Sequence, residues 1–152
     1  MKVVQVVNTM VSAVASSDTT IPCANDDTIP AITEGYEYMT LAITPKSATN
    51  KLKIEVVFNC SKAGTERYAA IALFQDTTSA ALAAIGFITH VSGEVHTFTH
   101  YMTAGTTSAT TFRIRAGCNE AETLTFNGAS GGSGRGFGGV MASSITITEY
   151  EG

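Results

Sequence analysis

The glycines near the C-terminus are the residues whose spacing most resembles a known chemical motif. Seven of the fourteen glycines fall within residues 127–139, and Gly134, Gly136 and Gly139 match the pattern G-x-G-x-x-G. In a dinucleotide-binding loop, this pattern precedes a helix whose N-terminus holds the pyrophosphate. Here residues 144–150 alternate polar and apolar side chains and are rich in β-branched residues, which predicts a strand instead. We therefore interpret the stretch as a long loop between the last two strands of an all-β fold.

The three histidines do not form an obvious metal site. His96 and His100 fall on one face of a predicted strand, but at about 3.3 Å per residue they lie roughly 13 Å apart. Because metal–nitrogen bonds are about 2 Å long, one ion cannot use both residues of a single chain. Only a three-fold axis could bring copies of one histidine together. We interpret His90, His96 and His100 as polar strand positions.

Four carboxylates, those of Asp26, Asp27, Glu34 and Glu37, are close together in the sequence. Loops rich in oxygen ligands suit Ca²⁺, but the D-x-D-x-D-G spacing of a calcium loop is absent. A solvated turn is the favoured interpretation, and calcium binding is left open.

The three cysteines form an odd set with no C-x-x-C spacing. Cys60 ends an inward-pointing alternation, which predicts a buried, inert thiol. A bridge between Cys23 and Cys118 is left open. A sparse and odd set of cysteines is typical of a chain that folds in a reducing cytoplasm.

Catalytic motifs are missing. The sequence has no G-x-S-x-G elbow for a nucleophile, and no pair of carboxylates is recognisable as a glycosidase pair. We expect no enzymatic activity, no catalytic residues and no cofactor.

Composition indicates one domain, residues 1–152, with a β-rich fold. Threonine is the commonest residue, with 23 copies, and only 14% of residues are charged. Residues that favour helices, such as Leu, Glu, Lys and Arg, are sparse. The net charge of −4 and the scattered basic residues disfavour nucleic-acid binding. No segment approaches the ~20 apolar residues of a membrane span, and polar residues interrupt the N-terminal run too early for a secretion signal.

Alternating patterns predict a series of short strands separated by turns rich in Gly, Asn, Ser and Thr, which is typical of a sandwich or barrel. The predicted strands are 3–11, 36–44, 51–60, 66–75, 85–90, 94–103, 108–116, 122–127 and 140–150. Residues 76–84 are interpreted as a helical turn or an irregular crossover. The strand at 66–75 is apolar on both faces, so it is either central to the core or pressed against another subunit.

Several segments carry a resemblance to a known group of proteins. These are TTIP at 19–22, DDTIP at 26–30, TEGYEYMTLAITP at 33–45, KLKIEVVFN at 51–59 and the final SSITITEY after the glycine-rich loop. Together they resemble small structural proteins of tailed bacteriophages, whose fold is similar to the C1q/TNF-like jelly roll. The resemblance implies an antiparallel jelly-roll β-sandwich of about eight to ten strands that forms homotrimers on the virion. Its motifs are structural, so no functional residue follows from it.

Two roles agree with this resemblance. The first is a surface subunit that decorates or stabilises the capsid, in the manner of a decoration or head-fibre protein, with the major capsid or tail proteins as partners. The second is a receptor-binding tail-fibre knob that recognises a host glycan or protein. The chain enters a predicted strand almost at once, without a heptad or shaft repeat, which favours the first role. A C1q-like lectin or ligand outside phages is a further alternative.

Six residues are expected at the subunit interface. Four lie on one face of the strand at 66–75, namely Tyr68, Ala70, Ala72 and Phe74, and two lie in the glycine-rich loop, namely Arg135 and Phe137. Ordering so many glycines costs ~1 kcal/mol or more per residue. We therefore expect Arg135 and Phe137 to hold the loop against a neighbouring subunit or the capsid shell.

Overall fold

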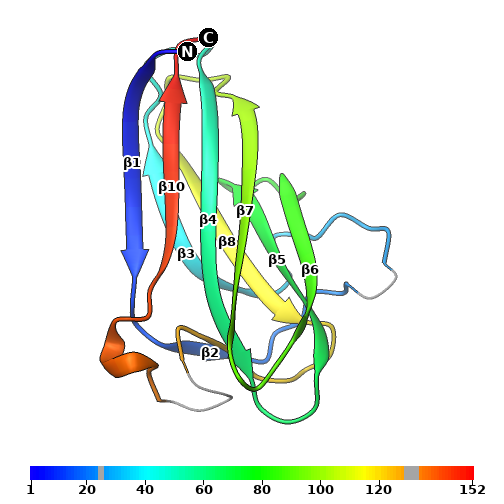
Figure 1. Cartoon of the computed structure of the whole chain (residues 1–152). Helices are drawn as coiled ribbons and strands as arrows, with labels where there is room; N and C mark the ends of the chain where they lie inside the picture. The colour runs from blue at the N-terminus through cyan, green and yellow to red at the C-terminus, as the bar shows by residue number, and fades with distance from the viewer. Residues whose placement is uncertain (24–25, 129–133) are drawn as a thin grey trace.

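Two antiparallel β-sheets packed face to face make up the computed structural model of the chain, which describes residues 1–23, 26–128 and 134–152 (Figure 1). The strands are β1 (Val3–Val11), β2 (Ala15–Ser17), β3 (Tyr36–Ile43), β4 (Lys51–Lys62), β5 (Arg67–Gln75), β6 (Ala83–Thr89), β7 (Glu94–Thr103), β8 (Thr110–Cys118), β9 (Leu124–Phe126) and β10 (Ser143–Tyr150). The larger sheet has the order β1-β10-β4-β9-β2, with β7 also paired to β4, and the smaller sheet has the order β3-β8-β5-β6. The prediction of an all-β antiparallel sandwich is confirmed.

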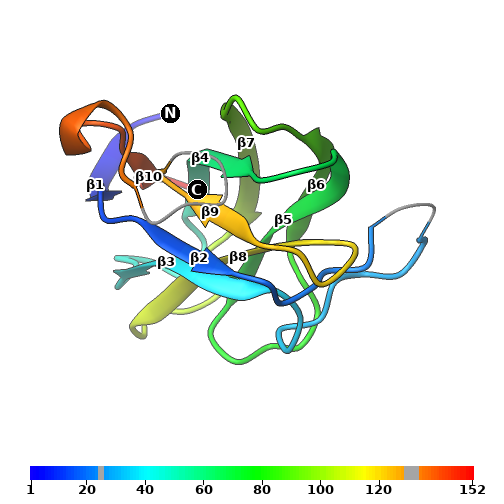
Figure 2. The ribbon, with the colours of Figure 1, turned by 90° about the horizontal axis from the view of Figure 1, so that it is seen from below.

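Alternation in the sequence explains most of the strands. In β4, every second residue from Leu52 to Cys60 is buried, and the residues between them are half-buried. Strands β2 and β9 are too short to show an alternation, and they pair with each other (Figure 2). Residues 76–82 form an irregular connection, in which the amide of Ile32 donates a hydrogen bond of 2.8 Å to the carbonyl of Ser79.

The core lies between the two sheets and is centred on three aromatic rings. The ring centroids of Tyr38, Phe58 and Phe126 lie 5.0–5.5 Å apart. The hydroxyl of Tyr38 donates to the carbonyl of Leu124 at 3.2 Å, and burial raises the pKa of Tyr38. The chain exposes 7232 Å², close to the roughly 7,300 Å² of a typical monomer of this mass. A complete core therefore forms within one chain.

The sequence of β5 left open whether this strand is central to the core or pressed against another subunit. In the structure, β5 is a central strand of the smaller sheet. It pairs with β8 on one side and β6 on the other. Ala70, Ala72 and Phe74 are at most 4% exposed although they face away from the core cluster. Pro22 and Pro30, from the loop before β3, line a pocket of about 150 Å³ together with Ala70. The chain thus buries both faces of β5 by itself.

A buried carboxylate joins the strands near the two chain ends, which lie together at one end of the sandwich (Figure 1). Glu149 faces inward from β10 and is fully buried. It accepts hydrogen bonds from the side chains of Gln5 at 2.5 Å and Asn50 at 2.7 Å, and from the amide of Lys46 at 2.8 Å. Burial alone would raise the pKa of Glu149, but these hydrogen bonds, together with one from the amide of Ser47, hold it below its usual value.

The glycine-rich segment leads into the final strand, as the sequence predicts. Residues 129–133 lie outside the described residues. Beyond them, Arg135 forms a β-bridge with Gly128, a short 3-10 turn η1 spans Phe137–Gly139, and β10 follows. Residues 134–152 contain no α-helix for a pyrophosphate. Among the described residues, no helix has the length and apolar character needed to cross a membrane.

Candidate functional site

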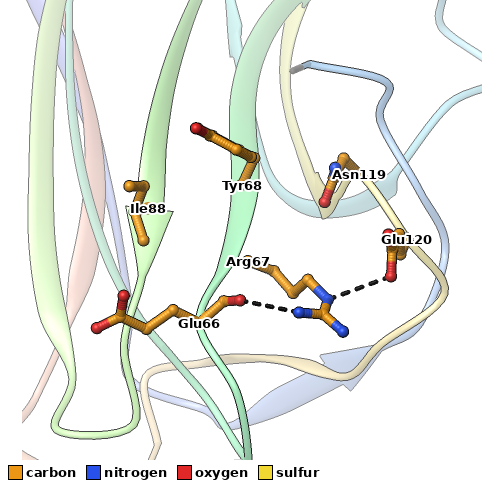
Figure 3. A pocket seen from close by; sticks show the side chains of 6 residues that line it. All are labelled: Glu66, Arg67, Tyr68, Ile88, Asn119 and Glu120. Atoms are coloured by element: carbon orange, nitrogen blue, oxygen red, sulfur yellow. Dashed lines mark hydrogen bonds and ion pairs between the residues drawn. The ribbon is translucent and has the colours of Figure 1, made fainter.

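A surface pocket of about 360 Å³ opens beside β5 and β6 (Figure 3). It is lined by Glu66, Arg67, Tyr68, Ile88, Asn119 and Glu120. Tyr68 and Ile88 are both about half exposed and provide apolar surface. Figure 3 shows Asn119 and Glu120 on the other side of Tyr68 from Ile88. The pocket thus combines an exposed aromatic ring with groups that can form hydrogen bonds.

The charges around this pocket are already paired. The guanidinium of Arg67 lies 3.2 Å from the carboxylate of Glu120 and 2.8 Å from that of Glu122. The buried ammonium of Lys62 pairs with Glu122 as well and donates to two backbone carbonyls. The hydrogen bond from Lys62 lowers the pKa of Glu122. Since Arg67 is neutralised, the pocket is a poor site for an anion, and a neutral polar ligand fits it better.

The outer face of the larger sheet is broad and carries little charge. The strand register places twelve of its residues in three neighbouring rows, and we call this set the threonine-rich face. It comprises Val6, Asn8 and Met10 of β1, Ser144, Thr146 and Thr148 of β10, Lys53, Glu55 and Val57 of β4, and Thr97, Thr99 and Tyr101 of β7. Its two charged members, Lys53 and Glu55, pair with each other at 3.1 Å.

Three of the four apolar members of the threonine-rich face are well exposed. Val6 is 56% exposed, Met10 69% and Tyr101 60%. The outer face of the smaller sheet differs, because it carries Arg113 and Arg115 beside Glu37. Val6, Met10 and Tyr101 lie on the edge strands β1 and β7 with polar residues between them, so the threonine-rich face combines exposed apolar side chains with a surface that carries little charge.

The six residues predicted for an interface do not lie on one surface. Ala70, Ala72 and Phe74 are buried within the chain, so they could touch another subunit only if the covering segments moved. Tyr68 is half exposed and lines the pocket on the smaller sheet. Arg135 and Phe137 are exposed, Phe137 by 81%, and precede the last strand of the larger sheet. Their contact with a neighbouring subunit stays a prediction.

Three of the four carboxylates near Asp26 have separate partners. Asp26 accepts hydrogen bonds from Thr28, Glu34 accepts one from the amide of Ala31 at 2.6 Å, and Glu37 pairs with Arg113 at 3.2 Å. They are not gathered into a calcium site among the described residues. The disulfide that the sequence left open is also not formed, because Cys118 is a buried free thiol.

A different set of potential metal ligands meets at one edge of the sandwich. The ligand atoms of Cys60, Glu94 and His96 all lie within 4.8 Å of one another, the only such group of three in residues 1–23, 26–128 and 134–152. The Nε2 atom of His96 lies 3.5 Å from a carboxylate oxygen of Glu94 and is buried without a hydrogen-bond partner. Burial raises the pKa of Cys60 well above its usual value, and Glu94 adds to the rise.

The spacing of histidines within one strand does not reveal this cluster, because its members come from two strands. Cys60 and Glu94 are direct cross-strand partners in the β4–β7 pair, and His96 is one step along the same face. Side chains at such positions lie within about 4.5–8 Å of one another. The sequence signal for the cluster is an inward-facing Glu and His in the strand at 94–103 that lie opposite a Cys in the strand at 51–60. This signal can be recognised only once the register between the two strands is known.

Comparison of the sequence with protein-family models and with curated proteins finds no match.

Proposed function

We propose that this protein is a structural subunit of a bacteriophage virion, which forms homotrimers and decorates or stabilises the surface of the particle. The strand order supports a jelly-roll assignment. Strands β1, β10, β4 and β7, with the short β2 and β9, form one sheet and β3, β8, β5 and β6 the other, so most successive strands along the chain alternate between sheets. Two nested Greek keys produce this order. The resemblance of the sequence to small phage structural proteins supports the same assignment.

The threonine-rich face carries the proposal of assembly. Stable interfaces are depleted in charge and enriched in aromatic residues and methionine at their centres. This face has Met10, Tyr101 and four threonines. Its two charged residues form an ion pair with each other. Packing three copies around an axis through this face covers the exposed apolar side chains. The other partners would be the major capsid or tail proteins of the same virion.

The pocket around Tyr68 favours a second candidate function, that of a receptor-binding knob. Sugars bind proteins by stacking on an aromatic ring while their hydroxyls form hydrogen bonds to side chains. Tyr68 is half exposed, and the buried Oδ1 of Asn119 beside it has no hydrogen-bond partner. These groups suit a neutral glycan on a host surface. No catalytic activity is proposed, and hydrolysis of a glycan panel by the purified protein would contradict this.

The first test is the mass of the purified protein in solution. Light scattering at micromolar concentration should give about three times the 15.9 kDa of one chain. The variant Thr97→Lys places a positive charge opposite Val57 on the threonine-rich face and should dissociate the trimer. Thr40→Lys is the matched control, because Thr40 is an exposed strand residue of the smaller sheet. A monomeric wild-type protein, or equal masses for the two variants, would contradict the proposed interface.

A binding experiment separates the two roles. Fluorescently labelled protein should bind purified capsids that lack it and should not stain intact bacterial cells. Staining of cells that is lost in Tyr68→Ala would favour the receptor-binding role and overturn the decorating one.

A further inference from the structure

We propose that Cys60, Glu94 and His96 bind a divalent transition-metal ion, for which Zn²⁺ is the best match. The cluster lies where β7 begins and β4 ends, on the inner face of the larger sheet near β6. This metal site is independent of the proposed assembly, because all three ligands come from one chain and none belongs to the threonine-rich face.

The distances between the ligand atoms fit a tetrahedral ion. With metal–ligand bonds of about 2.0–2.3 Å, tetrahedral ligand atoms lie about 3.3–3.6 Å apart. Here the Nε2 atom of His96 is 3.5 Å from one carboxylate oxygen of Glu94. The Sγ atom of Cys60 is 4.0 Å from the other oxygen. All three ligand atoms lie within 4.8 Å of one another, so the side chains need to close by up to about 1 Å to reach the tetrahedral spacing around one ion.

The surroundings hold the ligands in place. Cys60 and Glu94 are fixed by the β4–β7 ladder, and sites built on strands are more precise than sites built on loops. The ring of Phe87 stacks on the ring of His96 with centroids 3.8 Å apart. Glu94 accepts a hydrogen bond of 3.2 Å from the amide of His90, which is the kind of outer contact that orients a metal ligand.

The buried Nε2 atom of His96 has no hydrogen bond to another described residue. A buried polar atom without a hydrogen bond costs about 1–3 kcal/mol, and native proteins contain few of them. Coordination to a metal would satisfy this atom. The side chains of Glu94 and His96 are 15% and 23% exposed, so an ion has a route from solvent.

The chemistry of the three ligands selects the metal. Thiolate and imidazole ligands favour Zn²⁺ and related transition metals, whereas Ca²⁺ and Mg²⁺ prefer oxygen ligands alone. On binding, the thiol of Cys60 releases its proton to solvent and becomes a thiolate ligand. Three protein ligands and one water molecule complete a tetrahedral Zn²⁺ site.

Cobalt provides the test, because tetrahedral Co²⁺ is coloured and Zn²⁺ is not. The protein is stripped with a chelator, dialysed and titrated with CoCl₂. The wild type should develop the visible bands of tetrahedral Co²⁺ and a near-ultraviolet thiolate charge-transfer band, and ZnCl₂ should bleach both. Loss of one outer contact already weakens metal binding roughly 10–100-fold, so Cys60→Ala and His96→Phe should weaken binding by at least that factor.

Two control variants separate this site from other cysteines and histidines. Cys118→Ala removes the other buried thiol, and His100→Phe changes another inward-facing histidine of β7. Both should retain the cobalt spectrum. Absence of the charge-transfer band in wild type, or its persistence in Cys60→Ala, would overturn the proposal. Circular dichroism of each variant confirms that it is folded before titration.

Discussion

Two polar clusters face inward from the larger sheet, and they differ in how completely their groups are paired. At the end near the chain termini, the carboxylate of Glu149 receives hydrogen bonds from Gln5, Asn50 and backbone amides. At the edge near β6, the cluster of Cys60, Glu94 and His96 leaves a buried ring nitrogen without a hydrogen bond.

The difference separates a structural role from a binding role. A charge buried with all its hydrogen bonds made ties its neighbours together and leaves nothing for a ligand. A buried polar group that lacks a partner costs stability unless something outside the chain supplies one. We infer that the Glu149 network holds the termini and that the Cys60 cluster is available to an ion.

The largest effect is expected from breaking the Glu149 network. Glu149→Gln keeps the shape of the side chain but replaces one acceptor oxygen by a donor that faces other donors. Unfolding in urea should show a loss of about 2–4 kcal/mol.

The matched control for this variant is Glu151→Gln, two residues further along. Glu151 forms an exposed ion pair of 3.2 Å with Lys2, and its loss should change stability by about 0.5 kcal/mol or less. Similar losses in the two variants would show that the network around Glu149 is not a structural anchor.

Lowering the pH is expected to have an intermediate effect on the free energy of unfolding. Because the pKa of Glu149 is lowered in the folded state, its contribution to stability is present above the ordinary glutamate value of about 4.3. That contribution disappears as the pH falls through the folded-state pKa. Glu122, whose pKa is also lowered, acts in the same direction.

Urea unfolding at a series of pH values between 7 and 3 measures this dependence. The free energy of unfolding of wild type should fall steeply at the acidic end, and Glu149→Gln should flatten the fall. Parallel curves for the two proteins would contradict the assignment of the acid sensitivity to Glu149.

The smallest effect on stability is expected from a substitution in the cluster of Cys60, Glu94 and His96 when no metal is present. His96→Phe removes the unpartnered nitrogen and keeps a flat ring against Phe87. Replacing an unsatisfied polar group by an apolar one of similar shape is close to neutral. In the presence of a chelator, the stability should change by about 1 kcal/mol or less. A loss as large as that of Glu149→Gln would mean that His96 is a structural residue.

The sequence predicted most of the fold because alternation reports directly which side of a strand is buried. The predicted strand at 94–103 has the bounds of β7. The observed β4 ends two residues beyond the predicted strand at 51–60. The short strand β2 was missed, since three residues cannot show a period. The inward position of Glu149 is visible in the pattern of the last strand, but its partners come from distant segments.

The candidate sites were much harder to predict. Tyr68 was assigned to an interface because it lies on an apolar strand, yet it lines a pocket whose other side comes from the segment after β8. The cluster of Cys60 with Glu94 and His96 depends on the register between β4 and β7. Periodicity within one strand contains no information on register, so neither site could be derived from the sequence alone.

The most direct test of the contrast between the two clusters is anomalous diffraction at the zinc edge from crystals grown with ZnCl₂. The account predicts an anomalous peak bonded at about 2.0–2.3 Å to the sulfur of Cys60, a carboxylate oxygen of Glu94 and Nε2 of His96. No peak is predicted at Glu149. Zinc peaks elsewhere in the crystal, with none at these three atoms, would contradict it.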